Sequence, residues 1–145
     1  MIYAKFVQIK SINTMTKNYA ELFVVVGALN HFAQGGKTKG QKKLIKIAER
    51  LKPILDEYNE KAEELRLDNA SVDKDGNLIL NEKGGYQFTK EGAKKLAQQS
   101  KELNLSSFDF EPIKVLNPEG LEIFDFLSGW VEGVEFKLNI DDVEL

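Results

Sequence analysis

The sequence contains no cysteine and only one histidine, His31. Without cysteine the chain can form no disulfide, thiolate zinc site, iron–sulfur cluster or cysteine nucleophile. A single histidine argues against a histidine-based catalytic triad and against a metal site built from several histidines. Carboxylates are plentiful, but no spacing marks a catalytic pair. The sequence therefore predicts a protein that is not an enzyme, with no catalytic residue, cofactor or metal site.

Long hydrophobic runs are also missing. The longest apolar stretch, from Leu22 to Leu29, is far too short to span a bilayer. The first ten residues alternate between apolar and polar side chains and lack the apolar core of a signal peptide. Together with the absence of cysteine, these features predict a cytoplasmic protein with no membrane association.

The formal net charge of -3 is unevenly distributed along the chain. The basic segment, residues 37–52, carries seven lysines and arginines against Glu49 alone. Residues 105–145 carry ten acidic side chains against Lys114 and Lys137. We interpret this asymmetry as mutual attraction, either within the fold or between copies. Two alternatives are a basic face for phosphate or nucleic acid and an acidic surface for a basic partner.

Residues 17–34 carry signals for both strand and helix. The β-branched run after Leu22 favours a strand. Apolar residues from Tyr19 to Phe32 recur at helical spacing, and the stretch is too long for one strand. Because Gly35 and Gly36 follow as a typical helix stop, we predict a helix here.

The clearest periodicity belongs to an apolar seam with alternating spacings of four and three residues. Three heptads of this kind are typical of a coiled coil, and they predict a helix over residues 38–67. Pro53 lies inside this helix but off the seam, so it should kink the helix or divide it. The seam consists of Leu44, Ala48, Leu51, Leu55, Tyr58, Ala62 and Leu65.

The sequence pattern of residues 72–104 predicts a β-hairpin followed by another helix. Two short apolar segments, 78–80 and 86–88, flank a turn near residues 81–85, which ends in Gly84-Gly85. Thr89 is a suitable N-cap for a helix that runs to about Asn104. This helix and the seam helix would form an antiparallel helical hairpin with a β tip.

Shorter elements are expected on either side of the helical hairpin. We predict strands over residues 2–10 and 107–115, which could pair with each other, and a short helix over 119–127 opened by Pro118. Residues 134–138 predict a weak strand or a docking arm. The fold class is thus α+β and mostly helical, with a kinked antiparallel helical hairpin and β-hairpin tip packed on a small sheet. One domain, 1–145, would comprise parts 1–36, 37–104 and 105–145.

Two loop motifs partly match known binding sites. Residues 24–38 partly match a phosphate-binding loop, but His31 occupies the position where that loop needs glycine. Residues 71–82 partly match a calcium loop, with Asp73, Asp75 and Glu82 at ligand positions but Ser71 at the first. We interpret the first motif as a helix stop and the second as a turn.

Trp130, the only tryptophan, has two interpretations: a core residue, or an exposed anchor beside neighbouring phenylalanines. The candidate partner-binding residues are Lys37, Lys39, Lys42, Lys43, Lys46, Arg50, Phe124, Phe126, Trp130 and Phe136. The candidate self-association residues, taken from the seam, are Leu51, Leu55, Tyr58, Ala62 and Leu65.

The pattern from Leu44 to Val115, about half the chain, resembles a protein family. Its features are the heptad helix with Ile54-Leu-Asp-Glu-Tyr-Asn-Glu60, an Asp-Gly-Asn hairpin ending in Gly85-Tyr-Gln-Phe88, a further helix, and an extended segment with Pro112-Ile113. These features resemble a family of small uncharacterised proteins encoded by tailed bacteriophages. The resemblance implies an accessory or assembly protein in the host cytoplasm and supplies no catalytic residues.

We therefore expect a non-enzymatic protein-binding phage accessory protein with a host or phage protein as partner. It would either serve particle assembly, including homo-oligomer formation, or inhibit a host protein such as a defence effector. The alternative is a nucleic-acid-binding protein that uses the basic segment, whose affinity would fall steeply with salt. No aromatic residue lies among those lysines to stack on bases, which disfavours single-strand binding.

Overall fold

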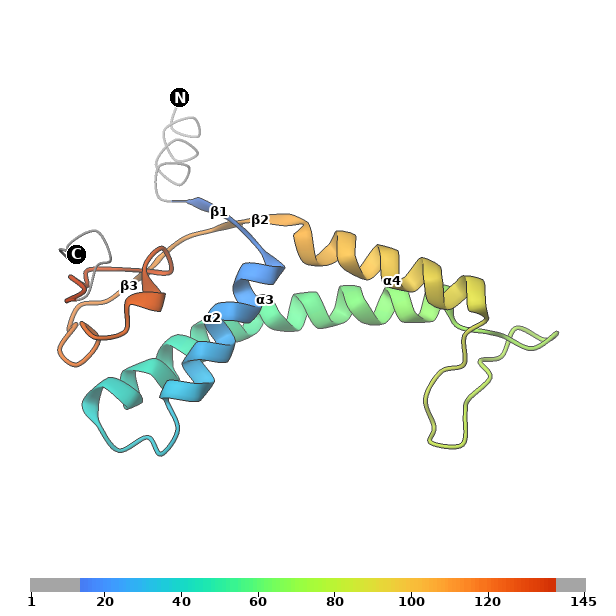
Figure 1. Ribbon diagram of the computed structural model, residues 1–145, viewed down its shortest axis with the longest axis horizontal. Helices are drawn as coiled ribbons and strands as arrows, with labels where there is room; N and C mark the ends of the chain where they lie inside the picture. The colour runs from blue at the N-terminus through green and yellow to red at the C-terminus, as the bar shows by residue number, and fades with distance from the viewer. Residues whose placement is uncertain (1–13, 138–145) are drawn as a thin grey trace, which may run out of the picture. The chain divides into compact units, whose positions relative to one another are not determined.

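The computed structural model describes residues 14–137 and confirms a mostly helical α+β fold (Figure 1). The predicted strand at 2–10 lies outside the described residues. No helix within 14–137 is long and apolar enough to cross a membrane. The elements in chain order are β1 (Met15–Asn18), α2 (Tyr19–Phe32), α3 (Lys39–Asn69), α4 (Lys90–Leu105), β2 (Ser107–Phe110), β3 (Ile113–Lys114), the 3₁₀ helix η1 (Asp125–Leu127) and β4 (Val131–Glu132).

The described chain divides into two compact units. Unit 1 combines residues 14–53 with 107–137, and unit 2 is Ile54–Ser106. Helix α3 contributes its first part to unit 1 and its second part to unit 2. The boundary follows Pro53, which lies inside a continuous helix and therefore does not break it.

Helix α2 confirms the helix predicted within residues 17–34, although it spans only Tyr19–Phe32, because Lys17 and Asn18 belong to β1. The Asn18 side chain accepts a hydrogen bond from the Glu21 backbone N–H at 2.8 Å, and the Glu21 carboxylate accepts one from the Asn18 N–H at 3.0 Å. This reciprocal capping box satisfies two backbone donors that the first turn leaves free. After Ala33 the chain turns through Gly35 and Gly36, both at positive φ, where a side chain would be strained.

A second reciprocal cap starts α3. The Thr38 hydroxyl accepts a hydrogen bond from the Gln41 N–H, while the Gln41 side-chain oxygen accepts from the Lys37 and Thr38 N–H groups. The Gln41 amide also donates to the Gln34 carbonyl at 2.8 Å, which ties the preceding loop to the helix.

Two small sheets complete unit 1. Strands β1 and β2 lie side by side and pair antiparallel, with Met15 opposite Phe110 and Asn18 opposite Ser107 (Figure 1). Strands β3 and β4 pair in parallel. The predicted strand 107–115 is therefore interrupted after Phe110, at Glu111 and Pro112. Proline has no N–H to donate to a ladder, which accounts for the break.

Every buried apolar side chain among residues 14–137 belongs to unit 1. Helix α2 buries the face formed by Tyr19, Leu22, Val25 and Leu29, whereas Phe32, which the periodicity placed on this face, is 46% exposed. The remaining core residues come from α3, the strands and the C-terminal loops: Leu44, Ile47, Leu51, Phe110, Ile113, Leu121, Leu127, Trp130 and Val131.

Unit 2 is the predicted antiparallel helical hairpin. Thr89 caps α4 by accepting a hydrogen bond from the Gly92 N–H at 3.0 Å. Tyr58 in α3 donates to Asn104 near the end of α4, and Asn69 near the end of α3 donates to Gln99. Figure 1 shows α4 alongside this part of α3. None of residues 54–106 is buried, so the hairpin has no closed apolar core of its own.

The β tip is less regular than predicted. Single bridges join Val72 to Leu78 and Leu80 to Tyr86, in place of two continuous strands at 78–80 and 86–88. The predicted turn is present, because the Asn81 carbonyl accepts a hydrogen bond from the Gly84 N–H. Gly84 has φ of 80°, as such a tight turn requires.

The predicted helix at 119–127 is wrong. The chain makes turns from Glu119 to Ile123, and only Asp125–Leu127 forms a short 3₁₀ helix. Gly120 has φ of 91°, which is incompatible with a right-handed helix. Its backbone also lies directly against that of Gly40 at the start of α3. Tertiary contact thus overrides the local helix signal of Pro118.

The predicted strand or arm at 134–138 is also corrected as far as the structure describes it. Residues 134–137 form no strand, and the strand of this region is β4, at Val131–Glu132. The Lys137 N–H donates to the Glu122 carbonyl at 2.8 Å, so the chain here returns to the preceding loop. The last residue of the prediction, Leu138, lies outside the described residues.

Two of the helical glycines, Gly40 and Gly27, should respond oppositely to alanine. A Cβ at Gly40 would collide with the Gly120 carbonyl, whereas one at Gly27 meets nothing within 4 Å. We expect Gly40→Ala to destabilise the protein by about 1–3 kcal/mol, because overpacking must displace a backbone segment. Gly27→Ala should stabilise it by about 0.5–1 kcal/mol through helix propensity. Denaturant unfolding measures both, and equal effects would contradict the proposed Gly40–Gly120 contact.

Candidate functional site

The basic segment occupies the loop before α3 and the first part of that helix. Most of its cations are exposed, and Lys43 is half-buried. The expected attraction between the basic segment and the acidic region is present within unit 1 at Glu119. Lys39 forms an exposed ion pair with Glu119 at 3.7 Å, and the Lys43 ammonium donates to the Glu119 carbonyl. Exposed pairs of this kind contribute about 0–1 kcal/mol, so they leave most of the positive charge available.

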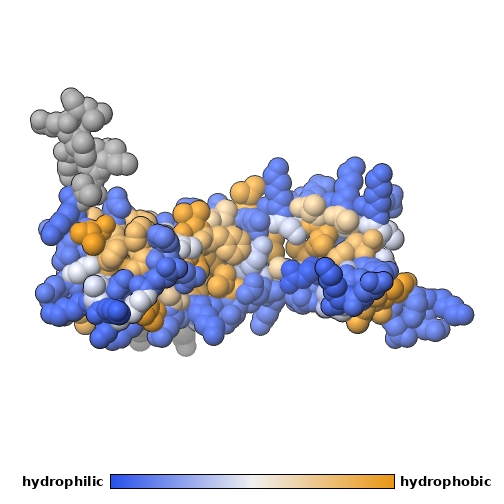
Figure 2. All heavy atoms as spheres, turned by 60° about the horizontal axis from the view of Figure 1, so that its bottom comes forward, coloured by the Kyte–Doolittle hydropathy of each residue, from blue (hydrophilic) through white to orange (hydrophobic). Residues whose placement is uncertain are grey.

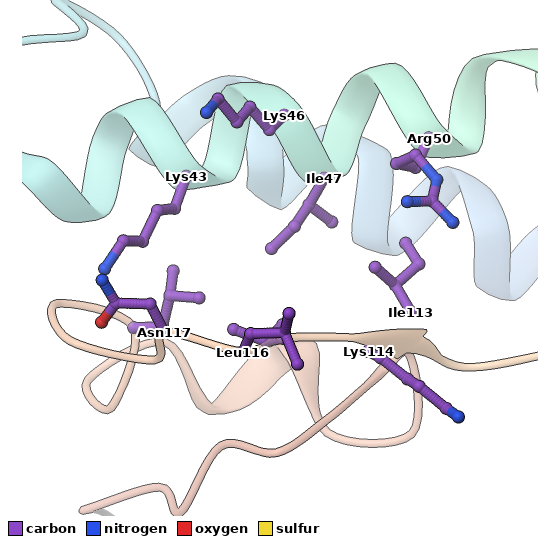
Figure 3. Close-up of a pocket in the computed structure, with 10 residues that line it drawn as sticks. Lys43, Lys46, Ile47, Arg50, Ile113, Lys114, Leu116 and Asn117 are labelled. Carbon is purple, nitrogen blue, oxygen red and sulfur yellow. The ribbon is translucent and has the colours of Figure 1, made fainter.

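A hollow of about 420 Å³ lies between α3 and the segment that follows Pro112 (Figure 3). Four residues from α3 line one side, and the opposite side comes from residues 113–117 and 121. We call this hollow the cationic pocket. It is lined by Lys43, Lys46, Ile47, Arg50, Ile113, Lys114, Val115, Leu116, Asn117 and Leu121.

Among the described residues 14–137, the charged side chains that line the cationic pocket are all positive. They are three lysines and one arginine, with no acidic side chain in this part of the chain. Among residues 14–137, no ion pair involves Lys46, Arg50 or Lys114. Clustered cations of one sign create a local positive potential, which attracts an anionic ligand.

The apolar part of the pocket has an enclosed floor and one open wall. Ile47 and Leu121 are buried at 4% and 0% exposure, whereas Leu116 is 96% exposed. Figure 3 shows Lys43 extending from α3 toward Asn117, while the ammonium groups of Lys46 and Lys114 point away from the centre. Because lysine stems are long and flexible, these groups can turn toward a bound anion. The pocket can therefore hold an anionic group beside an apolar one.

A smaller hollow of about 260 Å³ adjoins the cationic pocket. It is lined by Arg50, Glu111, Pro112 and Lys114, so the two hollows share Arg50 and Lys114. Within the described part of the chain, Glu111 is the one acidic side chain in this lining, and it partly offsets the two cations. The guanidinium of Arg50 can donate to a carboxylate through two parallel N–H groups.

Seven of the ten pocket residues are not among the predicted binding residues, and Lys114 and Leu116 are two of them. Lys114 lies outside the basic segment, and Leu116 falls in a stretch without periodicity. The available signal was that Lys114 is one of only two cations in the acidic region 105–145. Conversely, the predicted binding residues Lys37, Lys39 and Lys42 do not line the pocket.

Trp130 is a core residue, so its interpretation as an exposed anchor is wrong. Its exposure is 5%, and its ring lies 4.9 Å from that of Phe110. The Lys17 ammonium lies 4.7 Å from the centre of the indole ring. The electron-rich face of the ring attracts this cation electrostatically. These contacts hold Trp130 inside unit 1, where a partner cannot reach it.

The other predicted aromatic residues are half-buried, and two of them belong to one cluster. The ring centres of Phe124 and Phe126 lie 5.7 and 5.5 Å from the ring centre of Phe32. The His31 ring also contacts Phe32, with 4.9 Å between the ring centres. Among the described residues, no ring contact joins Phe136 to this cluster. The structure thus separates the aromatic candidates, and none of them lines the cationic pocket.

The seam is divided between the two units. Leu44 and Leu51 are fully buried in unit 1, so Leu51 is a core residue and not part of a self-association surface. The seam residues after Pro53 are half-buried in unit 2: Leu55, Tyr58, Ala62 and Leu65. Leu65 and Leu103 line a shallow hollow between α3 and α4.

Unit 2 also exposes several large apolar side chains. Val72, Leu80 and Leu105 are between 53% and 58% exposed. Figure 2 shows apolar patches bordered by hydrophilic residues on one face of the molecule. These side chains lie in the tip and at the end of α4.

A polar cluster holds the tip against α3 within unit 2. The Tyr86 hydroxyl donates a hydrogen bond to the Glu63 carboxylate, and Arg66 donates to the same carboxylate at 3.0 Å. The Tyr86 hydrogen bond, followed by the Arg66 contact, lowers the pKa of Glu63 below its ordinary value. The same hydrogen bond raises the pKa of Tyr86.

The calcium-like segment acts as a turn in the structure. The Asp73 carboxylate accepts hydrogen bonds from the Asp75 and Asn77 N–H groups at 2.9 and 3.0 Å. This is the local role of aspartate in a tight turn. Within residues 14–137, no three histidine or acidic side chains come together in a geometry that could hold a metal ion.

The half-buried seam of unit 2 predicts different effects for two neighbouring leucines. We expect Leu65→Asp to destabilise unit 2 by about 1–3 kcal/mol, since it places a charge against α4. Leu67→Asp is the matched control, because Leu67 is 42% exposed, and it should change stability by about 0.5 kcal/mol or less. Circular dichroism during unfolding measures helix loss. A folded monomer from Leu65→Asp, with an oligomeric wild type, would instead identify the seam as a self-association surface.

The Glu63 cluster makes the stability of unit 2 depend on pH. Because the folded state lowers the pKa of Glu63, its ionised form stabilises the fold above the ordinary glutamate pKa of about 4.3. That contribution is lost as the pH falls through the lowered pKa. We therefore expect Glu63→Gln to destabilise the protein at pH 7, with a smaller difference from wild type at about pH 3. A difference that stays constant between the two pH values would contradict this assignment.

Comparison with known proteins provides no evidence on function, so the functional proposal depends on the geometry of the site. No family model, curated protein or solved structure matches this chain. The resemblance to phage proteins therefore stays a prediction.

Proposed function

We propose that this chain is a non-enzymatic protein-binding module whose partner binds at the cationic pocket. The supporting observation is one hollow that combines Lys46, Arg50 and Lys114, which form no ion pair within residues 14–137, with the almost fully exposed Leu116. A protein surface offers carboxylates and aliphatic side chains close together, and such a surface can satisfy both parts of the hollow. The lining side chains are suited to binding an anion and an apolar group.

Nucleic-acid binding through the basic segment is the alternative. It is favoured by the exposed cations outside the pocket, Lys37, Lys42 and Lys52. The apolar residues of the pocket are aliphatic and cannot stack on bases as aromatic side chains do. An exposed leucine among cations gives no advantage for phosphate binding. The pocket is therefore better suited to a protein than to a nucleic acid.

The biological setting rests on the resemblance to phage proteins alone. In that setting the partner is a component of the phage particle or a host protein, such as a defence effector, that the chain inhibits. Both versions place the interaction in the host cytoplasm. The geometry of the pocket is compatible with either version, because it describes only the chemistry of the partner's surface.

Affinity capture with two matched charge-reversal variants tests the proposal. The pocket variant combines Lys46→Glu with Arg50→Glu, and the control combines Lys42→Glu with Lys52→Glu. Both pairs lie on α3 and change the net charge equally, but only the first lines the pocket. We expect the tagged wild type and the control to retain the same stoichiometric protein from a nuclease-treated bacterial lysate. The pocket variant should lose it.

Thermal unfolding of both variants checks that each remains folded. Equal loss of binding in the two variants would show that total positive charge matters, as expected for a nucleic acid. Capture that disappears on nuclease treatment would support the same alternative. Retention of the partner by a folded pocket variant would contradict binding at the cationic pocket.

A further inference from the structure

The two adjoining hollows describe the chemistry of the bound segment. We infer that the cationic pocket binds an extended acidic segment of the partner protein, with an aliphatic side chain that packs on Leu116 and carboxylates on both sides of it. This inference rests on the proposed function and specifies the partner's surface. Its elements are the exposed leucine, the cations on both walls and the shared position of Arg50.

Leu116 supplies the apolar contact. At 96% exposure it is among the most solvent-accessible large apolar side chains of unit 1, whereas Ile47 and Leu121 below it are almost fully enclosed. A partner side chain that covers Leu116 removes apolar surface from water on both molecules. Since Leu116 has almost no contacts to lose, its replacement should affect binding while leaving the fold intact.

The cations set the charge pattern of the ligand. Lys43, Lys46 and Arg50 lie on α3, and Lys114 lies on the opposite wall (Figure 3). Carboxylates on both sides of the central apolar residue would therefore meet positive charge. A single compact anion would leave one wall unpaired, so charge complementarity favours an acidic segment with several carboxylates.

Arg50 and Lys114 mark the direction in which the ligand continues. Both residues also line the second hollow, where Pro112 and Glu111 complete the wall. A carboxylate bound between Arg50 and Lys114 would bridge the two hollows. Glu111 opposes this carboxylate through like charge, so its neutralisation should tighten binding.

The test uses the full chain and a labelled peptide, Gly-Asp-Glu-Leu-Asp-Glu-Gly, with fluorescence anisotropy as the readout. We expect Leu116→Ser to weaken binding roughly tenfold, which corresponds to the burial of part of a leucine side chain. Ile123→Ser is the matched control, because Ile123 is 59% exposed and lies outside the pocket, and it should leave binding unchanged. The same peptide with alanine in place of leucine should bind the wild-type protein more weakly by a similar factor.

Charge variants complete the test. Lys46→Gln together with Arg50→Gln should weaken peptide binding by about fivefold or more, whereas Lys42→Gln with Lys52→Gln should have less than a twofold effect. Glu111→Gln should strengthen binding by about twofold. These differences should shrink at high salt because the charges are exposed.

Several results would overturn the inference. One is equal binding of the leucine and alanine peptides, and another is an unchanged affinity in Leu116→Ser. A third is an oligonucleotide that binds the pocket more tightly than the peptide does. If the peptide fails but the captured lysate protein is still lost by the Lys46→Glu, Arg50→Glu variant, the proposed function stands and the acidic segment is rejected. If capture does not depend on the pocket, the proposed function itself fails.

Discussion

The close approach of the Gly40 and Gly120 backbones is the contact on which the geometry of unit 1 depends. A side chain at Gly40 would collide with the Gly120 carbonyl, and Gly120 itself needs a positive φ. Because neither residue has a side chain, the turn at 119–121 can lie against the first turn of α3. That contact brings Leu121 into the core and places Glu119 within reach of Lys39 and Lys43. These two glycines therefore position the part of the opposite wall that Leu121 forms.

The two units are stabilised in different ways. Unit 1 buries apolar side chains from both of its sequence segments, whereas unit 2 relies on half-buried leucines and on hydrogen bonds such as Tyr58–Asn104 and Tyr86–Glu63. Hydrogen bonds contribute only about 0.5–1.5 kcal/mol each in net terms. The free energy of local opening should therefore be lower in unit 2 than in unit 1. A rigid binding surface is more readily built on unit 1, which is where the cationic pocket lies.

The cationic pocket does not serve the stability of the fold. Four cations in one hollow repel one another, and an exposed leucine gains nothing from packing. A surface that contributed only to stability would pair such charges with acidic side chains or place them far apart. The cost of this arrangement is offset when an acidic ligand binds, and for this reason the pocket is a better functional candidate than the buried aromatic residues.

The sequence predicted most of the helical structure because the relevant signals are local. Caps at Asn18, Thr38 and Thr89 act on backbone groups within three residues, and the seam periodicity fixes which side of α3 is apolar. Local signals failed where distant residues decide the conformation. Pro118 indicated a helix, but contact with Gly40 imposes a turn at Gly120. The predicted strand 107–115 was divided at Pro112, and its partner within the described residues is Met15–Asn18.

The candidate site shows the same division between local and tertiary information. The sequence by itself determined that Lys43, Lys46 and Arg50 share one side of a helix, since a spacing of three or four residues places them there. Only the tertiary structure decided that Lys114 and Leu116 lie opposite them and that Trp130 is enclosed. Residues more than sixty positions apart meet through long-range packing, and no local periodicity encodes such a meeting.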